Sequence, residues 1–223
     1  LSSLGRPRVT NQINLAMEAR QHQFSTDSTT LFFPSKTGRD MAAYIETTIP
    51  PDGLDFQLIE VFCTNITIGL ENVLLFAQLK DLAYNDQLLS IPNRLSFVHS
   101  LSMVIADKRS EETLALVDID HFSQLNDALG HSYGDTLLAA VAKRLKQTLP
   151  ADTVIARVDA DTFGVLGKDS LVRPELLQAI FRTPFNLDNS DHQLSASIGL
   201  ARLTEVEGDG SAALKCANIA LSF

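Results

Sequence analysis

The sequence predicts a mixed α/β (α+β) chain in which helices pack on a central sheet. Three observations predict this class. Apolar residues make up 45% of the 223 positions, which is enough for a packed core. Runs with a helical period alternate with short runs rich in β-forming residues. A helical pattern of about 30 residues without proline separates a short N-terminal unit from a longer C-terminal one.

Composition and charge exclude several classes of protein. The net charge of −9 and the pI near 4.9 disfavour attraction to a phosphate backbone, and no segment clusters Lys and Arg, so we expect no nucleic-acid partner. No run of about 18 uncharged apolar residues occurs, so we expect no membrane span. Cys63 and Cys216 lie in apolar helical patterns, which favours a reducing, cytoplasmic location over a disulfide framework.

The N-terminal unit is predicted to be a small α/β unit that ends in a long helix. A helical period covers 12–24, and strand-like runs cover 31–33 and 41–49 on either side of a turn-prone segment. The Pro-Pro-Asp-Gly sequence at 50–53 ends this part. A helix is then predicted over 54–84, because no proline or strong turn signal interrupts that stretch.

The long helix carries two apolar stripes. One follows heptad spacing and places two asparagines at a positions, where buried amides fix the register of two-stranded coils; its members are Leu54, Leu58, Val61, Asn65, Ile68, Asn72, Leu75, Leu79 and Leu82. This stripe predicts a parallel homodimer through 54–84. The alternative is that the helix packs on its own sheet through the second stripe, which is Phe56, Ile59, Cys63, Ile66, Leu70, Val73 and Ala77. Both hold if each stripe covers a different surface.

The C-terminal unit is predicted to be a sheet covered by helices in the ferredoxin-like order β-α-α-β-β-α-β. Helices are expected at 94–106, 121–129, 133–147, 175–181 and 211–222, and strands at 113–118, 153–157, 163–166 and 192–200. We therefore expect one unit at 1–85, which includes the long helix, and a second at 86–223.

Four stretches of the second unit carry distinctive residues in a fixed order. They are AYNDQLLSIPNR at 83–94, LVDIDHFSQLNDALGHSYGD at 116–135, RVDADTF at 157–163, and SASIG at 195–199 followed by the last helix. Together they resemble the GGDEF family of diguanylate cyclases over about residues 83–222. The resemblance implies a place in cyclic di-GMP signalling, in which the active enzymes join two GTP molecules.

The first unit resembles, less closely, the GAF-like sensory segments that precede such domains. The chain begins without methionine and ends inside an amphipathic helical pattern, so we expect a fragment of a longer protein, with the second unit truncated at its C-terminal end. The resemblance implies fused domains outside the fragment, such as an EAL phosphodiesterase or a response-regulator receiver.

The chemistry of the family requires carboxylates that hold Mg²⁺ against the phosphates of GTP. By resemblance, the metal ligands are Asp118, the carbonyl of Ile119, and Asp161. Two carboxylates on a strand end and a hairpin suit such a site, whereas a solvated loop is the structural alternative for Asp161.

The signature itself is degenerate, with Asp159, Ala160, Asp161, Thr162 and Phe163 at its five positions. Thr162 replaces the acid implicated in catalysis, and a hydroxyl neither ionises nor acts as a base near neutral pH. Ala160 replaces a glycine expected at positive φ, where alanine costs about 1–2 kcal/mol. Asp159 adds repulsion toward a triphosphate. We therefore assign no catalytic residue.

Two residues that read guanine in the family are retained. By resemblance, Asn126 and Asp135 would bind the guanine edge, although both also suit helix caps and loops. A phosphate-contacting lysine is replaced by Ser123, and the family's inhibitory R-x-x-D motif is replaced at 150–153. The sequence thus favours a non-catalytic GGDEF regulatory module that gates or dimerises a fused output domain. The alternatives are a weakly active cyclase and a GTP-binding sensor without turnover.

Overall fold

The computed structural model describes residues 7–35, 40–47, 53–107, 111–187 and 190–222. Contacts divide the chain into two compact units, Leu1–Leu79 and Lys80–Phe223. The division falls inside one long helix, and each unit is described by itself.

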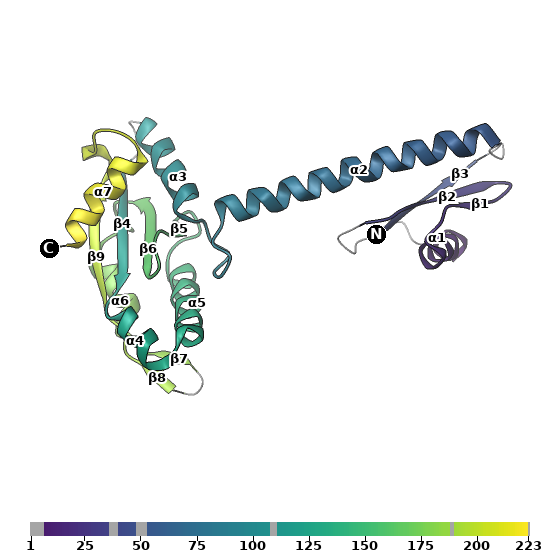
Figure 1. Cartoon of the computed structure of the whole chain (residues 1–223). Helices are drawn as coiled ribbons and strands as arrows, with labels where there is room; N and C mark the ends of the chain where they lie inside the picture. Colours follow the sequence, from purple (N-terminus) through teal and green to yellow (C-terminus); the bar gives the residue numbers. More distant parts are fainter. Residues whose placement is uncertain (1–6, 36–39, 48–52, 108–110, 188–189, 223) are drawn as a thin grey trace. The chain divides into compact units, whose positions relative to one another are not determined.

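The first unit is a three-stranded antiparallel sheet between two helices. The strands β1 (Gln23–Phe24), β2 (Ser28–Phe33) and β3 (Met41–Glu46) lie in the order β1-β2-β3. Helix α1 (Pro7–Ala19) and helix α2 (Gly53–Tyr84) lie on opposite sides of this sheet in Figure 1. The central strand β2 is buried along its whole length.

Several boundaries of the first unit differ from the prediction. The helix expected at 12–24 begins at Pro7, since proline is accepted in a first helical turn, and ends at Ala19. Arg20 stops it with a φ of 51°, in the left-handed region. The strand expected at 31–33 begins at Ser28, because three polar residues that gave no apolar signal are buried there. The last residues of the strand expected at 41–49 and most of the 50–53 turn lie outside the described residues.

Helix α2 matches the helix predicted at 54–84, and one of its stripes packs on its own sheet. Ile59, Cys63 and Ile66 contact Leu31 and Phe33 of β2. Burial raises the pKa of the Cys63 thiol. The packing alternative is therefore confirmed for these three residues.

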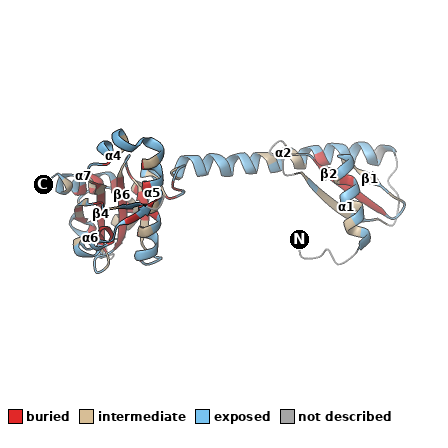
Figure 2. Ribbon diagram, turned by 90° about the horizontal axis from the view of Figure 1, so that it is seen from below, coloured by how far each residue is buried: buried red, intermediate tan, exposed pale blue. Residues whose placement is uncertain are grey.

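The heptad stripe of α2 is largely solvent-exposed in the single chain. Its apolar members have exposed fractions of 61% at Leu58, 61% at Val61, 50% at Ile68, 51% at Leu75, 63% at Leu79 and 57% at Leu82. The second stripe is covered only where it meets the sheet, since Val73 beyond it is 67% exposed, and Figure 2 accordingly draws most of α2 in pale blue.

Helix α2 is also apolar for its length. Its segment Asp55–Tyr84 contains a window of mean hydropathy 1.5, of which 6% is buried, so it is long and apolar enough to cross a bilayer. We expected no span because no uncharged apolar run of about 18 residues occurs, and within α2 it is Glu71 that breaks such a run. A single helix that passes on length and composition alone supports a span only weakly.

The second unit has the predicted ferredoxin-like fold. Its helices are α3 (Arg94–Ala106), α4 (Phe122–Leu129), α5 (His131–Thr148), α6 (Pro174–Arg182) and α7 (Gly210–Leu221). Its strands are β4 (Glu112–Ile119), β5 (Val154–Arg157), β6 (Thr162–Lys168), β7 (Phe185–Leu187), β8 (Ser190–His192) and β9 (Ala196–Arg202). The main sheet has the order β5-β6-β4-β9 and is antiparallel throughout.

Helices cover both faces of this sheet, so its central strand is buried on both sides. Ala115, Val117 and Ile119 of β4 pack toward α5 and α6, whereas Leu114 and Leu116 pack toward α3 and α7. Figure 2 shows the buried layer in red between these helices. The sheet is therefore a rigid support for the residues at its ends.

The strand predicted at 192–200 is divided in the structure. Residues 190–192 form β8, which pairs with β7 in a separate two-stranded hairpin, and β9 begins only at Ala196. Between them, Gln193 donates a hydrogen bond from Nε2 to the carbonyl of Phe181, which holds the chain at the end of α6. The alternation of apolar residues continues across this break, which is why the sequence indicated one strand.

Candidate functional site

The predicted metal ligands converge at one end of the main sheet. Asp118 stands near the end of β4, and Asp161 directly precedes β6. The amide of Ile119 donates to the carbonyl oxygen of Asp161 at 3.3 Å. The antiparallel register places Asp118 opposite Thr162. Residues that are far apart in the sequence thus become neighbours at this edge.

Negative charge accumulates at this end of the sheet. The pKa of Asp118 is raised, first by partial burial and then by the neighbouring carboxylates of Asp161, Asp120 and Asp159. A hydrogen bond from Thr162 lowers it in part. Asp120 is held in place by Ser197, whose hydroxyl donates to Oδ1 at 2.7 Å. A divalent cation would relieve this repulsion, so the donor set fits Mg²⁺.

The cluster is not a preformed metal cage. Within the described residues, no group of three His, Cys, Asp or Glu side chains is arranged to hold a metal ion. The family's third carboxylate is the one that Thr162 replaces. The ligand set of Asp118, Asp161 and the Ile119 carbonyl stays a prediction.

Replacing Asp118 with asparagine should stabilise the second unit near pH 7. Because the folded-state pKa of Asp118 is raised, folding favours the protonated carboxyl, and stability falls as pH rises through that folded pKa. An asparagine side chain stays neutral at every pH, so Asp118→Asn removes this penalty. We expect a gain of about 0.2–1 kcal/mol in the free energy of unfolding at pH 7, the size typical of exposed charge pairs.

Urea unfolding at pH 7 and near pH 3 measures this effect. At the lower pH the gain should disappear, since the native carboxyl is then protonated as well. Asp152→Asn, at an exposed position outside the cluster, is the matched control and should change little. Equal gains at both pH values for Asp118→Asn would contradict the electrostatic explanation.

Thr162 occupies the hairpin position at which the family has its acid. Its side chain is buried, with 8% of the residue exposed, and it donates a hydrogen bond to Asp118. The family's acid would here supply a second negative charge beside Asp118. A threonine hydroxyl supplies neither that charge nor a base near neutral pH.

The hairpin turn forms without the strain that the sequence predicted. Among described non-glycine residues, positive φ occurs only at Arg20, Ser90 and His121, so the expected left-handed conformation at Ala160 is wrong. The amide of Val158 donates to the carbonyl of Thr162 at 2.9 Å, and the amide of Ala160 donates to Oδ1 of Asp159 at 2.9 Å. The remaining obstacles to a triphosphate are the Ala160 methyl and the Asp159 charge.

Arg157 ties the hairpin to the segment that follows α2. Its Nε and Nη2 donate to the carbonyl of Ala160 at 3.1 and 2.7 Å, and its Nη1 lies 3.2 Å from Oδ2 of Asp86. Asp86 also accepts the amides of Leu88 and Leu89. The sequence did not predict this ion pair. Its only signal was that both residues lie in stretches that resemble the GGDEF family, at 83–94 and 157–163.

The predicted guanine-binding residues lie inside helices. Asn126 belongs to α4 and Asp135 to α5, and the residue preceding α5 at its N-terminus is Gly130, so the alternative that both are caps or loop residues is wrong. The Oδ1 atom of Asn126 is buried and accepts no hydrogen bond among the described residues. A Cβ at Gly134 would lie 1.9 Å from it, so a larger residue at 134 would force the Asn126 side chain to move.

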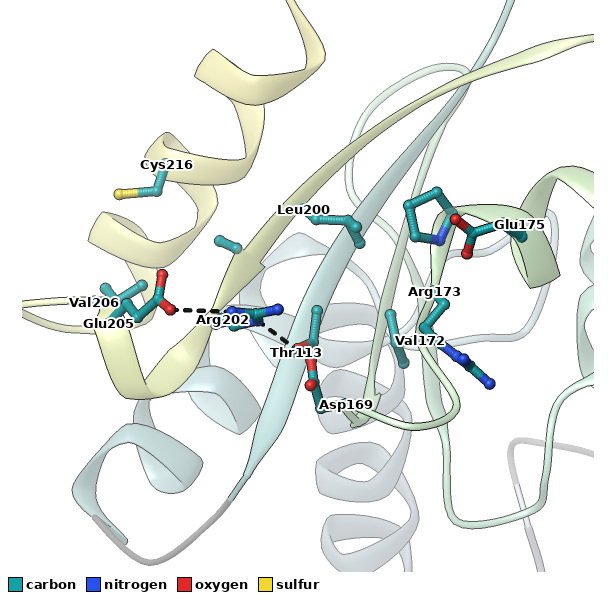
Figure 3. Close-up of a pocket in the computed structure, with 12 residues that line it drawn as sticks. Thr113, Asp169, Val172, Arg173, Glu175, Leu200, Arg202, Glu205, Val206 and Cys216 are labelled. Atoms are coloured by element: carbon teal, nitrogen blue, oxygen red, sulfur yellow. Dashed lines mark hydrogen bonds and ion pairs between the residues drawn. The ribbon is translucent and has the colours of Figure 1, made fainter.

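A separate cavity of about 590 Å³ lies at the opposite end of β4. Figure 3 shows Arg202 between Glu205 and Asp169, at 3.4 and 3.7 Å, and Thr113 donates to Asp169 at 2.6 Å. Arg202 is thus paired with two carboxylates of the protein itself. We assign no function to this cavity.

Two family profiles match the chain in succession. The one described as "Diguanylate cyclase, GGDEF domain" matches residues 83–222, and a "Domain of unknown function (DUF3369)" matches residues 1–79. "Diguanylate cyclase TpbB" of Pseudomonas aeruginosa is 34% identical over 155 residues, which cover 65% of this chain and 36% of that protein. "Signaling protein YkoW" of Bacillus subtilis is 30% identical over 151 residues, covering 63% and 19%. The match thus spans about a third or less of these two relatives.

Solved structures show the same fold. The GGDEF domain of TpbB from P. aeruginosa superimposes with a TM-score of 0.57 at 31% identity, covering 62% of this chain and 87% of that one. The coiled coil and GGDEF domain of DgcB from Caulobacter crescentus, in complex with c-di-GMP, gives a TM-score of 0.60 at 23% identity, covering 74% and 92%.

Proposed function

Because residues 83–222 place this chain in the GGDEF family of diguanylate cyclase domains, we propose that it is a catalytically inactive regulatory module of a cyclic di-GMP signalling protein. One observation carries the proposal. Thr162 is buried opposite Asp118 and hydrogen-bonds to it, at the position where the family has an acid. The site therefore lacks the group to which catalysis is attributed.

The remaining residues suit binding better than turnover. Asp118, Asp161 and the Ile119 carbonyl would hold Mg²⁺, which neutralises phosphate charge when bound. The Asp159 carboxylate and the Ala160 methyl stand where a triphosphate would approach the hairpin backbone. Thr162 provides no general base at neutral pH at the position where the family has its acid.

The direct test is to incubate the purified chain with GTP and Mg²⁺ or Mn²⁺ and to measure cyclic dinucleotide by mass spectrometry. We expect none above a no-protein blank. Product that disappears in Asp118→Ala would overturn the proposal, because it would show turnover through this cleft. Product that persists in that variant would be traced to a contaminating enzyme.

A GTP sensor without turnover is the second candidate function, and Asn126 favours it. Its Oδ1 has no hydrogen-bond partner among the described residues and would accept an N–H group of guanine once the side chain turns out of its buried position. The Asp135 carboxylate is another acceptor. GTP at 100 times its dissociation constant should stabilise the fold by about 2.7 kcal/mol. A rise in melting temperature with GTP that is lost in Asn126→Ala and kept in the control Asn218→Ala is the expected result. A flat titration would eliminate the sensor.

The regulatory role that we propose involves the first unit and fused domains. We propose that residues 1–79 form a GAF-like sensory unit and that α2 joins two chains in a homodimer. An EAL phosphodiesterase or a receiver domain elsewhere in the protein would then provide the output or the input. A cytoplasmic location is supported by two free cysteines, of which Cys216 is exposed.

A further inference from the structure

The first unit contains a groove of about 1,140 Å³ beside helix α2. One wall comes from the end of α1, β1 and β2, and the other comes from α2 over 60–71, so the whole groove lies within Leu1–Leu79. Three members of the heptad stripe also line it, namely Val61, Asn65 and Ile68. The groove and the face of α2 that we assign to the homodimer are therefore parts of one continuous surface.

Next to the heptad stripe, α2 carries a further row of residues that the single chain leaves exposed. With Asn65 and Asn72 at a positions, the e positions are held by Phe62, Gly69 and Phe76. The two phenylalanines are 58% and 72% exposed, and large apolar side chains exposed side by side mark an interaction surface. The apolar face of α2 is thus wider than a seam of a and d positions alone.

Gly69 is a glycine that no contact within the described part of the chain explains. It lies in the interior of α2, where glycine destabilises a helix relative to alanine. A Cβ at this position would meet nothing within 4 Å. A second chain whose surface approaches α2 closely at this point would give the glycine a purpose, because it would leave no room for a larger side chain.

The heptad positions specify how two copies of α2 meet. The two asparagines at a positions each face their own copy only if the helices run parallel and in register, because an antiparallel pair would place them against apolar d positions. In the parallel arrangement, each g position faces the next e position of the other helix. Gln57 therefore faces Phe62 of the partner subunit. Thr64, which lines the groove, faces the partner's Gly69.

Phe24 lies at the end of the groove where the partner's Phe62 arrives. It is 38% exposed, and its ring packs edge-on against Phe56 with the centroids 4.5 Å apart. Phe56 directly precedes Gln57 on α2. A phenylalanine that a second chain places beside Gln57 is thus next to the exposed part of the Phe24 ring, where an aromatic pair is favourable.

We propose that this groove receives the α2 helix of a second copy of this chain, so that Phe62 of the partner subunit packs on Phe24 and the partner's Gly69 lies against Thr64. By two-fold symmetry, Phe62 of this chain packs on the partner's Phe24. The wall formed by α1, β1 and β2 then contributes to the interface together with the seam. This inference rests on the proposed homodimer and adds to it a contact that pairing of the seam alone does not require.

A double-mutant cycle, measured on the whole chain by sedimentation equilibrium, tests the contact. Phe24→Ala and Phe62→Ala should each raise the dissociation constant of the dimer at least tenfold. The double variant should raise it little further than either single change, because both changes remove the same contact. Val73→Ala is the matched control and should change little, since Val73 is 67% exposed on α2 but lies outside the groove, the seam and the e row.

The outcomes separate this contact from the homodimer itself. A native chain that is monomeric at every concentration overturns both, and binding of that monomer to phosphatidylcholine vesicles would assign the exposed face of α2 to a bilayer. A dimer that Phe24→Ala leaves unchanged, or in which the effects of the two changes multiply, overturns the groove contact and leaves the seam intact.

Circular dichroism should show the same helix content in all variants, so that lost association does not reflect unfolding. Should Phe24→Ala lower the helix content, Phe24→Leu takes its place in the cycle, because leucine keeps an apolar contact with Phe56. The same lack of additivity with Phe62→Ala is then expected, and independent effects would again overturn the groove contact.

Discussion

Restoring the hairpin should give this chain detectable diguanylate cyclase activity. The variant combines Asp159→Gly, Ala160→Gly and Thr162→Glu, which returns a carboxylate opposite Asp118 and removes the methyl and the charge. A general acid or base contributes about 10²–10⁴-fold to a reaction rate. We therefore expect the single restored carboxylate to raise the rate enough for product to be measured.

The restored variant should be compared with two others. The pair Asp159→Gly and Ala160→Gly alone should give no product, since Thr162 remains. Adding Asp118→Ala to the restored variant should abolish the product again, because a metal ligand is lost. Equal activity of the glycine pair and the full restoration would show that the hairpin's bulk, and not its missing acid, limits the reaction.

Leu75→Lys should convert a dimer of this chain into monomers. Leu75 lies at a d position of the heptad stripe and is 51% exposed in the single chain, so a partner helix would bury it. A lysine at the centre of that seam would leave a charge in an apolar interface, and a single buried leucine removed from such a seam costs about 2–5 kcal/mol. We expect the dissociation constant of the dimer to rise at least thirtyfold.

Sedimentation equilibrium measures this change. Ala77→Lys is the matched control, because it adds the same charge two residues away on the stripe that faces away from the seam. It should leave the association unchanged. A native chain that stays monomeric at high concentration, or equal weakening by both variants, would argue against the α2 interface.

The fold could be predicted where local signals agree with tertiary packing. The helix predicted at 94–106 matches α3 at both ends, and its start is fixed by Asn93, whose Oδ1 accepts the amide of Ser96 at 3.1 Å. The polar half of β2 could not be predicted. Ser28, Thr29 and Thr30 are 2%, 3% and 1% exposed, but only their position in the central strand explains that burial.

The site was predicted in part. The spacing of Asp118, Asp161 and Thr162 came from the resemblance, and the antiparallel register brings them together. The conformation of Ala160 was predicted wrongly, because an Asp159 side chain that bonds to the next amide closes the turn in another way. The Arg157–Asp86 pair joins residues 71 positions apart, a separation over which periodicity carries no information.

A crystal structure of this chain grown with Mg²⁺ and a non-hydrolysable GTP analogue tests most directly whether Thr162 leaves the cleft inert. We expect either no nucleotide or a guanine held at Asn126 and Asp135, without two metal ions between Asp118 and the hairpin. A triphosphate engaged by the hairpin amides, with two ions coordinated by Asp118 and Asp161, would contradict the proposed inactivity.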